Sequence, residues 1–494
     1  MVVENDLCGC ELSRSALPAR KGFDFYKCRE QRESAKSRCI FHDLDPRKDA
    51  EELSRRLYEK RDSRYIGYVF PESFTFTRFK LQGADFAHCQ FLGTVDFQGS
   101  VFRGHTDFSF AIFDKGAHFR GARFKGSVNF TGALFRGQAW FNDATLDSCV
   151  NLTSAHFKDE FWFAGIGDAI ADMTGTIFEK DAHFHNTFFA GASFIETQFG
   201  GQATFGFYKY IAHGHSCEQA STSPDIVFFE GVDMSRVLFR EANLKRASFN
   251  QCYNLDQARF FDCTWNLGYG RNNILYDELE LRKKMPPWEK MAKCEGVKRK
   301  CGLLGDASEL DAQDDKAAES RLERSHASVE ETCRAFKKHF EDRRNYLVAG
   351  DFHEGEMEMR RLAKGTWGRR LLSIEAVYWL LSRYGQSWLR PLACFIALNL
   401  IAAVIYSFSG LQLESERAPM RLEITAEPSP ILMLESLFIY LHAFLYSFSV
   451  SALLRGVYAT PTSLVGLLLQ TVQFILGPLL ILLIGLAIRR RVRR

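Results

Sequence analysis

Five side chains of the types that ligate zinc lie close together near the start of the chain. They read C-x-C-x17-C-x10-C-x2-H and are Cys8, Cys10, Cys28, Cys39 and His42. Thiolates and an imidazole at this density suit a tetrahedral structural zinc site, which would use four of the five. The segment is too short and too charged to own a hydrophobic core, so a metal would supply folding free energy. Unligated buried or surface thiols are the alternative, and the pattern leaves both open.

A second group of polar residues, between positions 336 and 361, could be mistaken for catalytic carboxylates. Its acidic members alternate with arginines and are Asp351, Glu354, Glu356 and Glu358. Such alternation is typical of a solvated, salt-bridged helix face. No nucleophile or phosphate-binding loop accompanies these residues, so we expect that the chain is not an enzyme.

Composition narrows the class of protein further. The 494 residues carry 63 Lys+Arg against 60 Asp+Glu, a net charge of only +3, and this balance gives no electrostatic reason to expect a nucleic-acid partner. The first residues contain no basic region followed by an apolar stretch, so we expect no cleavable signal peptide. The large part of the chain before the apolar C-terminal stretches is therefore expected in the cytosol, with most of its 13 cysteines reduced.

The 45 phenylalanines indicate which elements position these groups. From residue 86 onward a large apolar residue recurs in alternating steps of five and six, a period of eleven. A small or β-branched residue lies two positions before most of these centres. Neither a helix nor an ordinary strand produces this spacing, and fixed self-similarity indicates a solenoid. The centres are Phe86, Phe91, Phe97, Phe102, Phe108, Phe113, Phe119, Phe124, Phe130, Phe135 and Phe141.

This pattern resembles the pentapeptide-repeat family, most closely at residues 242–246 (ANLKR) and 247–251 (ASFNQ). The resemblance implies a right-handed quadrilateral β-helix over residues 70–265, with inward-pointing centres and a loop excursion at 206–225. Two periods of eleven residues make one coil, which is slightly longer than the twenty-residue coil that is usual in the family. A solenoid needs a cap at each end, and the segments on either side of the repeats are candidates.

The remaining chain divides into three further regions. Residues 1–60 form the Cys/His-rich region, and residues 272–388 are expected to be a cytosolic helical connector with a disordered linker near 298–328. Residues 389–494 form a membrane domain with charge-free spans at 391–409 and 463–488. Arginines precede the first span and follow the last, so the positive-inside rule places both termini in the cytoplasm and the protein in the inner membrane. The apolar segment 431–454 is then re-entrant, because the number of crossings must be even.

The order of span, re-entrant helix, loop and span resembles the pore module of two-transmembrane potassium-channel-like proteins. That resemblance implies a homotetramer that conducts inorganic ions, with a filter region after the re-entrant helix. The order of residues there differs from the TVGYG filter, and Arg455 adds a positive charge, so potassium selectivity is not implied. The corresponding residues are Ser451, Arg455, Gly456, Val457, Tyr458, Ala459 and Thr460.

The last span contains the other candidate residues of a pathway. Gly477 and Pro478 lie midway along it, where a missing backbone donor permits a kink, so they are a candidate gating hinge or an ordinary kink in an anchor. Gln470, Thr471 and Gln473 are its polar residues and are expected to line the pore, since amides facing lipid are costly.

Two functions follow from these observations. The first is an oligomeric membrane ion channel-like protein with a degenerate filter and a cytosolic pentapeptide-repeat sensor or scaffold domain. The second is a membrane-anchored scaffold without conductance. Arg455 and the altered filter favour the scaffold, whereas Gly477, Pro478 and the order of the segments favour the channel. The expected partners are the lipid bilayer, further copies of the chain and inorganic ions, with structural zinc as a cofactor and no nucleic acid.

Overall fold

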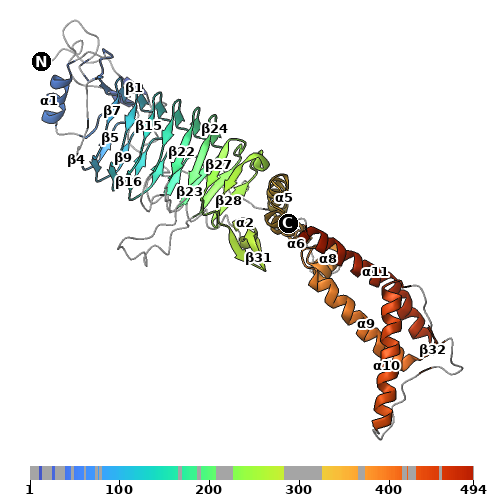
Figure 1. Cartoon of the computed structure of the whole chain (residues 1–494). Coiled ribbons are helices and arrows are strands. Elements are labelled where there is room, and N and C mark those ends of the chain that lie inside the picture. Colours follow the sequence, from blue (N-terminus) through green and yellow to red (C-terminus); the bar gives the residue numbers. More distant parts are fainter. Residues whose placement is uncertain are drawn as a thin grey trace. The chain divides into compact units, whose positions relative to one another are not determined.

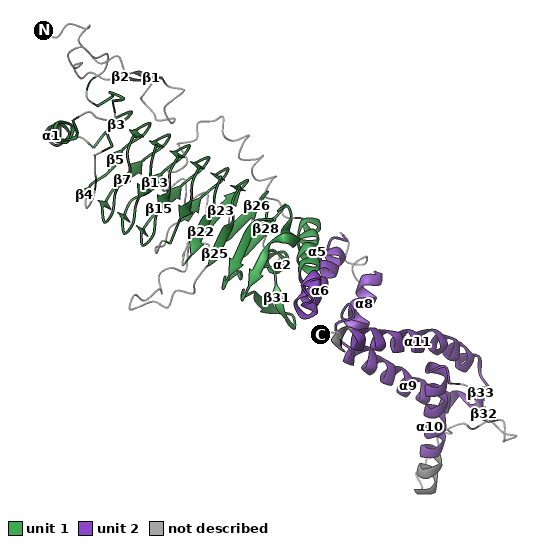
Figure 2. Cartoon of the chain, turned by 45° about the horizontal axis from the view of Figure 1, so that its top comes forward, with its two compact units in different colours: residues 1–339 green, residues 340–494 purple. Residues whose placement is uncertain are grey.

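The structure is a computed structural model of the whole chain (Figure 1). It falls into two compact units, Met1–His339 and Phe340–Arg494 (Figure 2), and the boundary between them lies inside the predicted connector. The residues that it describes are 11–13, 25–27, 39, 41–45, 49–60, 63–72, 76, 80–164, 170–185, 191–206, 226–282, 325–364, 373–413, 420, 430–454 and 459–492.

Four parallel sheets run along the first unit, and every strand pairs with the strands one coil before and after it (Figure 1). One sheet contains β5 (Ala84–Asp85), β9 (Thr106–Asp107), β13 (Val128–Asn129), β17 (Val150–Asn151), β20 (Ile170–Asp172), β23 (Gly191–Ile195), β26 (Val227–Glu230) and β28 (Ala247–Asn250). The next contains β7 (Val95–Asp96), β11 (Ala117–His118), β15 (Ala139–Trp140), β19 (Phe161–Trp162), β22 (Ala182–His185), β25 (Ala203–Gly206), β27 (Val237–Arg240) and β29 (Arg259–Phe261).

The other two sheets complete the coils. The third contains β3 (Val69–Phe70), β6 (Gln90–Phe91), β10 (Ile112–Phe113), β14 (Leu134–Phe135), β18 (His156–Phe157), β21 (Ile177–Phe178) and β24 (Gln198–Phe199). The fourth is shorter and contains β4 (Lys80–Leu81), β8 (Val101–Phe102), β12 (Arg123–Phe124) and β16 (Thr145–Leu146). The predicted β-solenoid is thus confirmed, while its right-handed, quadrilateral form stays a prediction. Most of the predicted excursion, residues 207–225, lies outside the described residues.

Strand register gives the length of each coil. Ala84 pairs with Thr106, Thr106 with Val128 and Val128 with Val150, so each of these coils spans two periods of eleven, as the sequence predicts. Val150 then pairs with Ala171, so the next coil is one residue shorter. Near the end of the solenoid Val227 pairs with Ala247, and that coil is shorter by two. Apart from the coil that contains the excursion, in which Ala192 pairs with Val227, these later coils are thus closer to the family's usual length.

Stacked phenylalanine rings fill the interior of the coils. The ring of Phe108 lies 4.8 Å from that of Phe86 and 5.0 Å from that of Phe130, and the planes are within a few degrees of parallel. A neighbouring column stacks Phe113 on Phe135 at 4.5 Å. All of these rings are buried. The rings repeat because parallel strands about 4.8 Å apart bring equivalent side chains into contact, and each buried ring contributes hydrophobic free energy of roughly 2–3 kcal/mol.

Short polar side chains satisfy the turns between the strands. The Asn129 side-chain oxygen accepts a hydrogen bond from the Thr131 backbone N–H at 3.1 Å, and its amide donates to Asp107 one coil away at 3.1 Å. Asp107 in turn accepts from the Ser109 backbone N–H at 2.9 Å. This Asx turn is the reason that Asn or Asp recurs just before a buried centre.

The C-terminal end of the solenoid is capped by α2 (Tyr276–Arg282) and α5 (His326–Asp342), beside the hairpin of β30 (Asn266–Gly268) and β31 (Arg271–Ile274) and after the short 3-10 helix Leu255–Gln257. The ring of Phe336 lies 5.4 Å from that of Phe249 and 5.3 Å from that of Phe260, so it closes the core. The Asp277 carboxylate accepts hydrogen bonds from the Phe249 backbone N–H at 3.0 Å and the Ser248 hydroxyl at 2.7 Å. The expected cap is therefore present at this end.

The N-terminal end carries β1 (Glu11–Ser13), β2 (Phe25–Lys27), α1 (Ala50–Lys60) and a short turn that contains Phe41. The ring of Phe41 stacks on Tyr68 at 4.7 Å, and the Phe41 carbonyl accepts from the Val69 backbone N–H at 2.7 Å. Tyr65 stacks on Phe86 at 4.7 Å, so aromatic rings continue the core column into this end.

The second unit contains α6 (Tyr346–Leu362), α8 (Ile374–Ser382), α9 (Leu389–Ser409), α10 (Pro430–Ser451) and α11 (Leu464–Val492), with the short strands β32 (Leu411–Leu413) and β33 (Ala459–Pro461). The prediction that α6 carries a solvated face was wrong, because Glu354, Glu356 and Glu358 are all buried. Arg383 donates to Glu354 at 2.9 Å and Arg361 to Glu358 at 2.6 Å, so arginines cover these carboxylates.

The described cysteines differ in their bonding. Cys89, Cys263 and Cys394 are free thiols. Cys149 is buried and disulfide-bonded.

Strand β12 offers a direct test of the inward and outward positions. Phe124 is buried between coils, whereas its neighbour Arg123 is exposed. We predict that Phe124→Asp lowers the free energy of unfolding by roughly 4 kcal/mol or more, because it removes a core ring and buries a charge. Arg123→Asp should change the free energy of unfolding by less than about 1 kcal/mol. Urea unfolding of the full chain, followed by circular dichroism, measures both, and equal losses would contradict the register.

Candidate functional site

Two helices of the second unit are long and apolar enough to cross a membrane. They are α9 over Leu389–Ser409 and α11 over Leu464–Arg489, with mean hydropathies of 2.1 and 2.4. Only 33% and 22% of their most apolar windows are buried inside the chain, unlike the core helix of a soluble protein. The predicted spans 391–409 and 463–488 coincide with these two helices to within two residues at each end.

A two-stranded sheet ties one end of α9 to one end of α11. Helix α9 ends at Gly410, which has φ of 87°, and β32 follows at once. β32 pairs antiparallel with β33, and the Thr462 backbone N–H donates to the Gly410 carbonyl at 3.2 Å. Since α11 starts two residues later, the end of α9 and the start of α11 lie at the same level along the helix axes.

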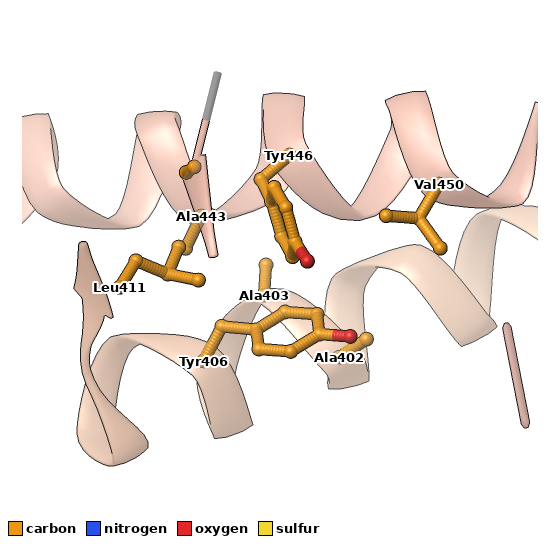
Figure 3. Packing of buried hydrophobic residues seen from close by; sticks show 8 residues of the cluster. Ala402, Ala403, Tyr406, Leu411, Ala443, Tyr446 and Val450 are labelled. Carbon is orange, nitrogen blue, oxygen red and sulfur yellow. The ribbon is translucent and has the colours of Figure 1, made fainter. Parts of the chain in front are cut away.

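Helix α10 packs against both α9 and α11 through small and aromatic side chains. Figure 3 shows Tyr406 of α9 and Tyr446 of α10 facing each other, with ring centres 5.0 Å apart and nearly perpendicular planes. Ala402, Ala403 and Ala443 surround the two rings and are buried. Small residues at such contacts let helix backbones approach closely.

A chain of buried polar side chains joins all three helices. The Ser447 hydroxyl donates to the Asn399 side-chain oxygen at 2.9 Å, and the Gln473 amide donates to the Ser447 oxygen at 2.6 Å. The same amide lies 3.2 Å from the Ser451 oxygen, and the Tyr406 hydroxyl donates to the Gln473 carbonyl oxygen at 2.8 Å. In an apolar unit such bonds fix which helix faces meet, because an unmatched register would leave these groups without partners.

The last turn of α10 lies against the middle of α11. A Cβ atom added to Gly477 would lie 2.3 Å from the Ser451 carbonyl oxygen and 2.5 Å from its Cα, so only glycine permits this approach. Gly477 is thirteen residues after Leu464, which places the end of α10 about 20 Å below the β32–β33 level. Helix α10 therefore ends at mid-depth of the two apolar helices.

The chain leaves α10 in a left-handed turn. Leu453 has φ of 54°, and the Leu454 backbone N–H donates to the Ser449 carbonyl at 3.0 Å, which terminates the helix. Ala459, in β33, is buried back at the level of β32. The described ends of the connection between Ser451 and Ala459 thus lie at different depths, one in the middle of α11 and the other beside its first turn.

The residues predicted for the filter divide into two groups. Ser451 is buried beside Gln473, and Ala459 and Thr460 are held in β33. Arg455, Gly456, Val457 and Tyr458 lie outside the described residues, so the predicted roles of these four residues stay predictions.

The residues predicted to line a pore also divide. Gln473 is completely buried within the chain. Gln470 is partly exposed and Thr471 is exposed, with the Thr471 hydroxyl bonded to the Leu467 carbonyl at 3.0 Å. Gly477 makes a packing contact, and α11 continues as a helix through Pro478. A hinge at these two positions stays a prediction.

Three members of the polar network were missed at the sequence level: Tyr406, Asn399 and Ser447. Asn399 carried a usable signal, since it is the one amide in the apolar segment 391–409. Its Nδ2 group donates to the Phe395 carbonyl at 2.8 Å, which leaves the side-chain oxygen for Ser447.

Helix α8 presents an apolar surface directly before α9. Ile374, Val377 and Leu380 are exposed at a spacing of three, so they lie on one face of the helix. Contacts with the segment after α6 hold the other side: Lys364 forms an ion pair with Glu375 and thereby lowers the pKa of that carboxyl.

A buried tyrosine, Tyr384, lies just after the end of helix α8. The Tyr384 hydroxyl donates to Glu358 at 2.9 Å, and burial, together with the charge of Glu358, raises the pKa of Tyr384. The ion pair and this hydrogen bond fix α8 on α6 with its apolar face outward.

The predicted zinc ligands are described only in part. Cys39 Sγ lies 3.2 Å from His42 Nδ1, and both residues are buried. Cys8, Cys10 and Cys28 lie outside the described residues. Among the residues that the structure describes, no group of three or more His, Cys, Asp and Glu side chains could hold a metal ion.

The geometry defines a β-solenoid joined in sequence to a helical unit with two apolar helices of membrane-spanning length. The family model for pentapeptide repeats (9 copies) matches residues 76–123 and 119–166. These residues therefore carry pentapeptide repeats, and the resemblance is confirmed for this part of the chain. No curated protein and no solved structure matches the chain.

Two glycines of α11 provide a matched test of the helix contact. We predict that Gly477→Ala destabilises the folded second unit by roughly 1–3 kcal/mol, because a methyl group cannot fit against the Ser451 backbone. Nothing lies within 4 Å of a Cβ added to Gly485, so Gly485→Ala should be neutral or slightly stabilising. Thermal unfolding of the purified protein in detergent compares the two variants. A similar melting temperature for both would contradict the close contact.

Proposed function

We propose that this chain is a homo-oligomeric membrane protein in which residues 389–494 form an ion channel-like pore module and the pentapeptide repeats form a cytosolic sensor or scaffold. The observation that carries the proposal is the position of α10. Its last turn lies at mid-depth against Gly477, and the chain then returns to the β32–β33 level. A helix that ends at mid-depth before the chain returns is what a re-entrant pore helix requires.

Membrane insertion is supported by the exposed surface of the second unit. Large apolar side chains cover most of α9 and α11 in one protomer, and water would be a poor solvent for them. The apolar face of α8 suits the boundary between headgroups and acyl chains at the start of α9. Arg390 lies in the first turn of α9 and Arg489 near the end of α11, which favours a cytoplasmic location for both ends by the positive-inside rule. The inner membrane is the corresponding compartment.

Assembly of several copies is supported by the physics of the α10 terminus. Non-helical backbone at membrane depth is stable only when protein covers it or when it lines water, and two spanning helices cannot surround it. Helix α10 also exposes Leu437, Leu441 and Leu445 at a spacing of four, so they lie on one face of the helix. A second copy of the chain is the occupant that we propose for this face, and the resemblance to channels suggests four copies.

Charge then sets the expected behaviour of the pathway. Arg455 follows the α10 terminus in sequence, and one such residue per subunit would form a ring of positive charge. Rings of charged side chains set ion selectivity, so this ring would repel cations and favour anions. The acidic residues between α9 and α10 act in the opposite direction, and solvent screens charges at a distance.

A membrane-anchored scaffold is the second candidate, and one observation favours it. Gln473 was the amide best suited to line a pore. Its side chain is instead hydrogen-bonded to Ser447 and Tyr406 within one protomer. A helix bundle whose polar groups are satisfied internally can serve as an anchor without any conducting path. The repeats would then be the functional part of the molecule.

Planar-bilayer recording of the purified full-length protein separates the two candidates. We predict ion conduction, and we predict that Arg455→Glu shifts the reversal potential toward cation preference in an asymmetric salt gradient. Arg390→Glu makes the same charge change in the first turn of α9, at the end of this helix that lies away from the β32–β33 sheet. It should shift the reversal potential much less.

Each result of this recording has a defined meaning. Absence of conductance in the unmutated protein, which should still be oligomeric by mass measurement, would support the scaffold and contradict the channel. Conduction with an unchanged reversal potential in Arg455→Glu would remove this residue from the pathway.

A further inference from the structure

Helix α8 presents large apolar side chains to solvent directly before a helix of membrane-spanning length. Ile374 is 86% exposed, Leu380 is 62% exposed, and Val377 lies on the same face. Leu389, the first residue of α9, is 58% exposed as well. Apolar side chains that stay uncovered together indicate an interaction surface, and this one continues from α8 to the start of α9.

The connection between α8 and α9 is a sharp turn. Arg383, Tyr384 and Gly385 have φ of 52°, 55° and 77°, so three successive residues lie outside the helical region. The Arg383 backbone N–H donates to the Trp379 carbonyl at 2.9 Å and caps α8. Helix α8 is therefore a separate element, and its apolar face is not part of the spanning helix.

An arginine of α9 reaches back to the end of α8. Arg390 Nη1 donates to the Trp379 carbonyl at 3.3 Å, and the guanidinium carbon lies 5.4 Å from the centre of the Trp379 ring, a cation–π distance. Both side chains are at the surface. Tryptophan is enriched at the level of the lipid headgroups, because its ring is apolar and its N–H is polar. The pair therefore suits the boundary between a membrane and water.

Carboxylates on the neighbouring helices are already matched by other basic side chains. Among the residues that the structure describes, no carboxylate forms an ion pair with Arg390, and its one side-chain hydrogen bond goes to a carbonyl. The charge of Arg390 thus stays available to an external anion. The matched pairs are Glu354 with Arg383, Glu358 with Arg361, and Glu375 with Lys364.

The chemistry of this surface limits the anion that it fits. A guanidinium has five N–H donors in a planar fork, which matches the oxygens of a phosphate. A soluble phosphate would satisfy the charge but would leave Ile374, Val377 and Leu380 uncovered. An anionic phospholipid satisfies both requirements, since its headgroup carries the phosphate and its acyl chains are apolar.

We propose that the Arg390–Trp379 pair binds the headgroup phosphate of an anionic phospholipid, whose acyl chains cover the apolar face of α8. This proposal rests on the membrane insertion that is part of the proposed function, and it does not depend on ion conduction. The competing role for Arg390 is a helix cap alone, because a cation at the C-terminal end of α8 is favourable without any ligand. A cap alone predicts no preference among lipids.

Native mass spectrometry of the purified full-length protein in detergent tests the preference. Titration with phosphatidylglycerol and with phosphatidylcholine gives a dissociation constant for the first bound molecule of each lipid. We expect the anionic lipid to bind about fivefold more tightly, the effect of one arginine near an anionic surface. Phosphatidylcholine also carries a phosphate but has no net charge, so the comparison isolates the charge.

Three variants assign this preference to Arg390. Arg390→Gln should lower the ratio of the two dissociation constants to about one, since glutamine carries no charge. Arg390→Lys keeps the charge without the planar fork and should retain part of the preference. Arg123→Gln is the matched control, because Arg123 is an exposed arginine of the solenoid. It should leave the ratio unchanged.

Carbonate extraction of membranes that contain the unmutated protein reports insertion separately. A protein that stays in the membrane but binds both lipids equally would overturn the lipid site and leave membrane insertion intact. Release by carbonate would contradict insertion, and with it both proposals. An unchanged preference in Arg390→Gln would also overturn the site. The comparison of lipids in the unmutated protein needs no variant, so misfolding of a variant cannot obscure it.

Discussion

Backbone N–H and C=O groups that are removed from water must find hydrogen-bond partners, and both units of this chain are organised around that requirement. The solenoid satisfies it by pairing the described short strands with their equivalents one coil away, so a cap is needed where the coils stop. At one end the Asp277 carboxylate accepts the Phe249 backbone N–H of the last coil. In the second unit the same requirement applies to the terminus of α10, which lies between apolar helices and is stabilised by a left-handed turn and by polar side chains of α10 and α11.

Much of the solenoid could be predicted because its inward side chains recur at a fixed spacing along the sequence. A spacing of eleven fixed which phenylalanines point inward, and strand register confirms coils of two such periods from Ala84 to Val150. The shortening of later coils was not predicted, since it depends on turns whose sequences vary. The cap formed by Asp277 could not be foreseen either, because a single carboxylate has no periodic signal. The buried carboxylates on α6 were misread for a related reason: Arg383, which covers Glu354, lies beyond the next helix in the sequence.

The second unit shows where sequence patterns stop being informative. Charge-free length identified α9 and α11. The balance of flanking arginines led to the prediction of a re-entrant 431–454, which stays a prediction. Side-chain pairing across three helices depends on their rotation and depth, and composition specifies neither. Gln473 was therefore expected at a pore surface but bonds to Ser447 instead. Gly477 was expected as a hinge, and the structure gives it a close contact with Ser451. Tight packing at this glycine and bending elsewhere along α11 are compatible.

The depth of the α10 terminus is the central claim, and it can be measured directly. A nitroxide attached at Ala452→Cys, in a cysteine-depleted chain reconstituted in lipid vesicles, reports its depth through collisions with oxygen and with a water-soluble relaxation agent. Reference labels at Gln412→Cys and Arg489→Cys mark the two ends of the helices. The account predicts that the label at 452 lies near the bilayer centre, between the two references. A label at headgroup depth, on either side, would contradict it.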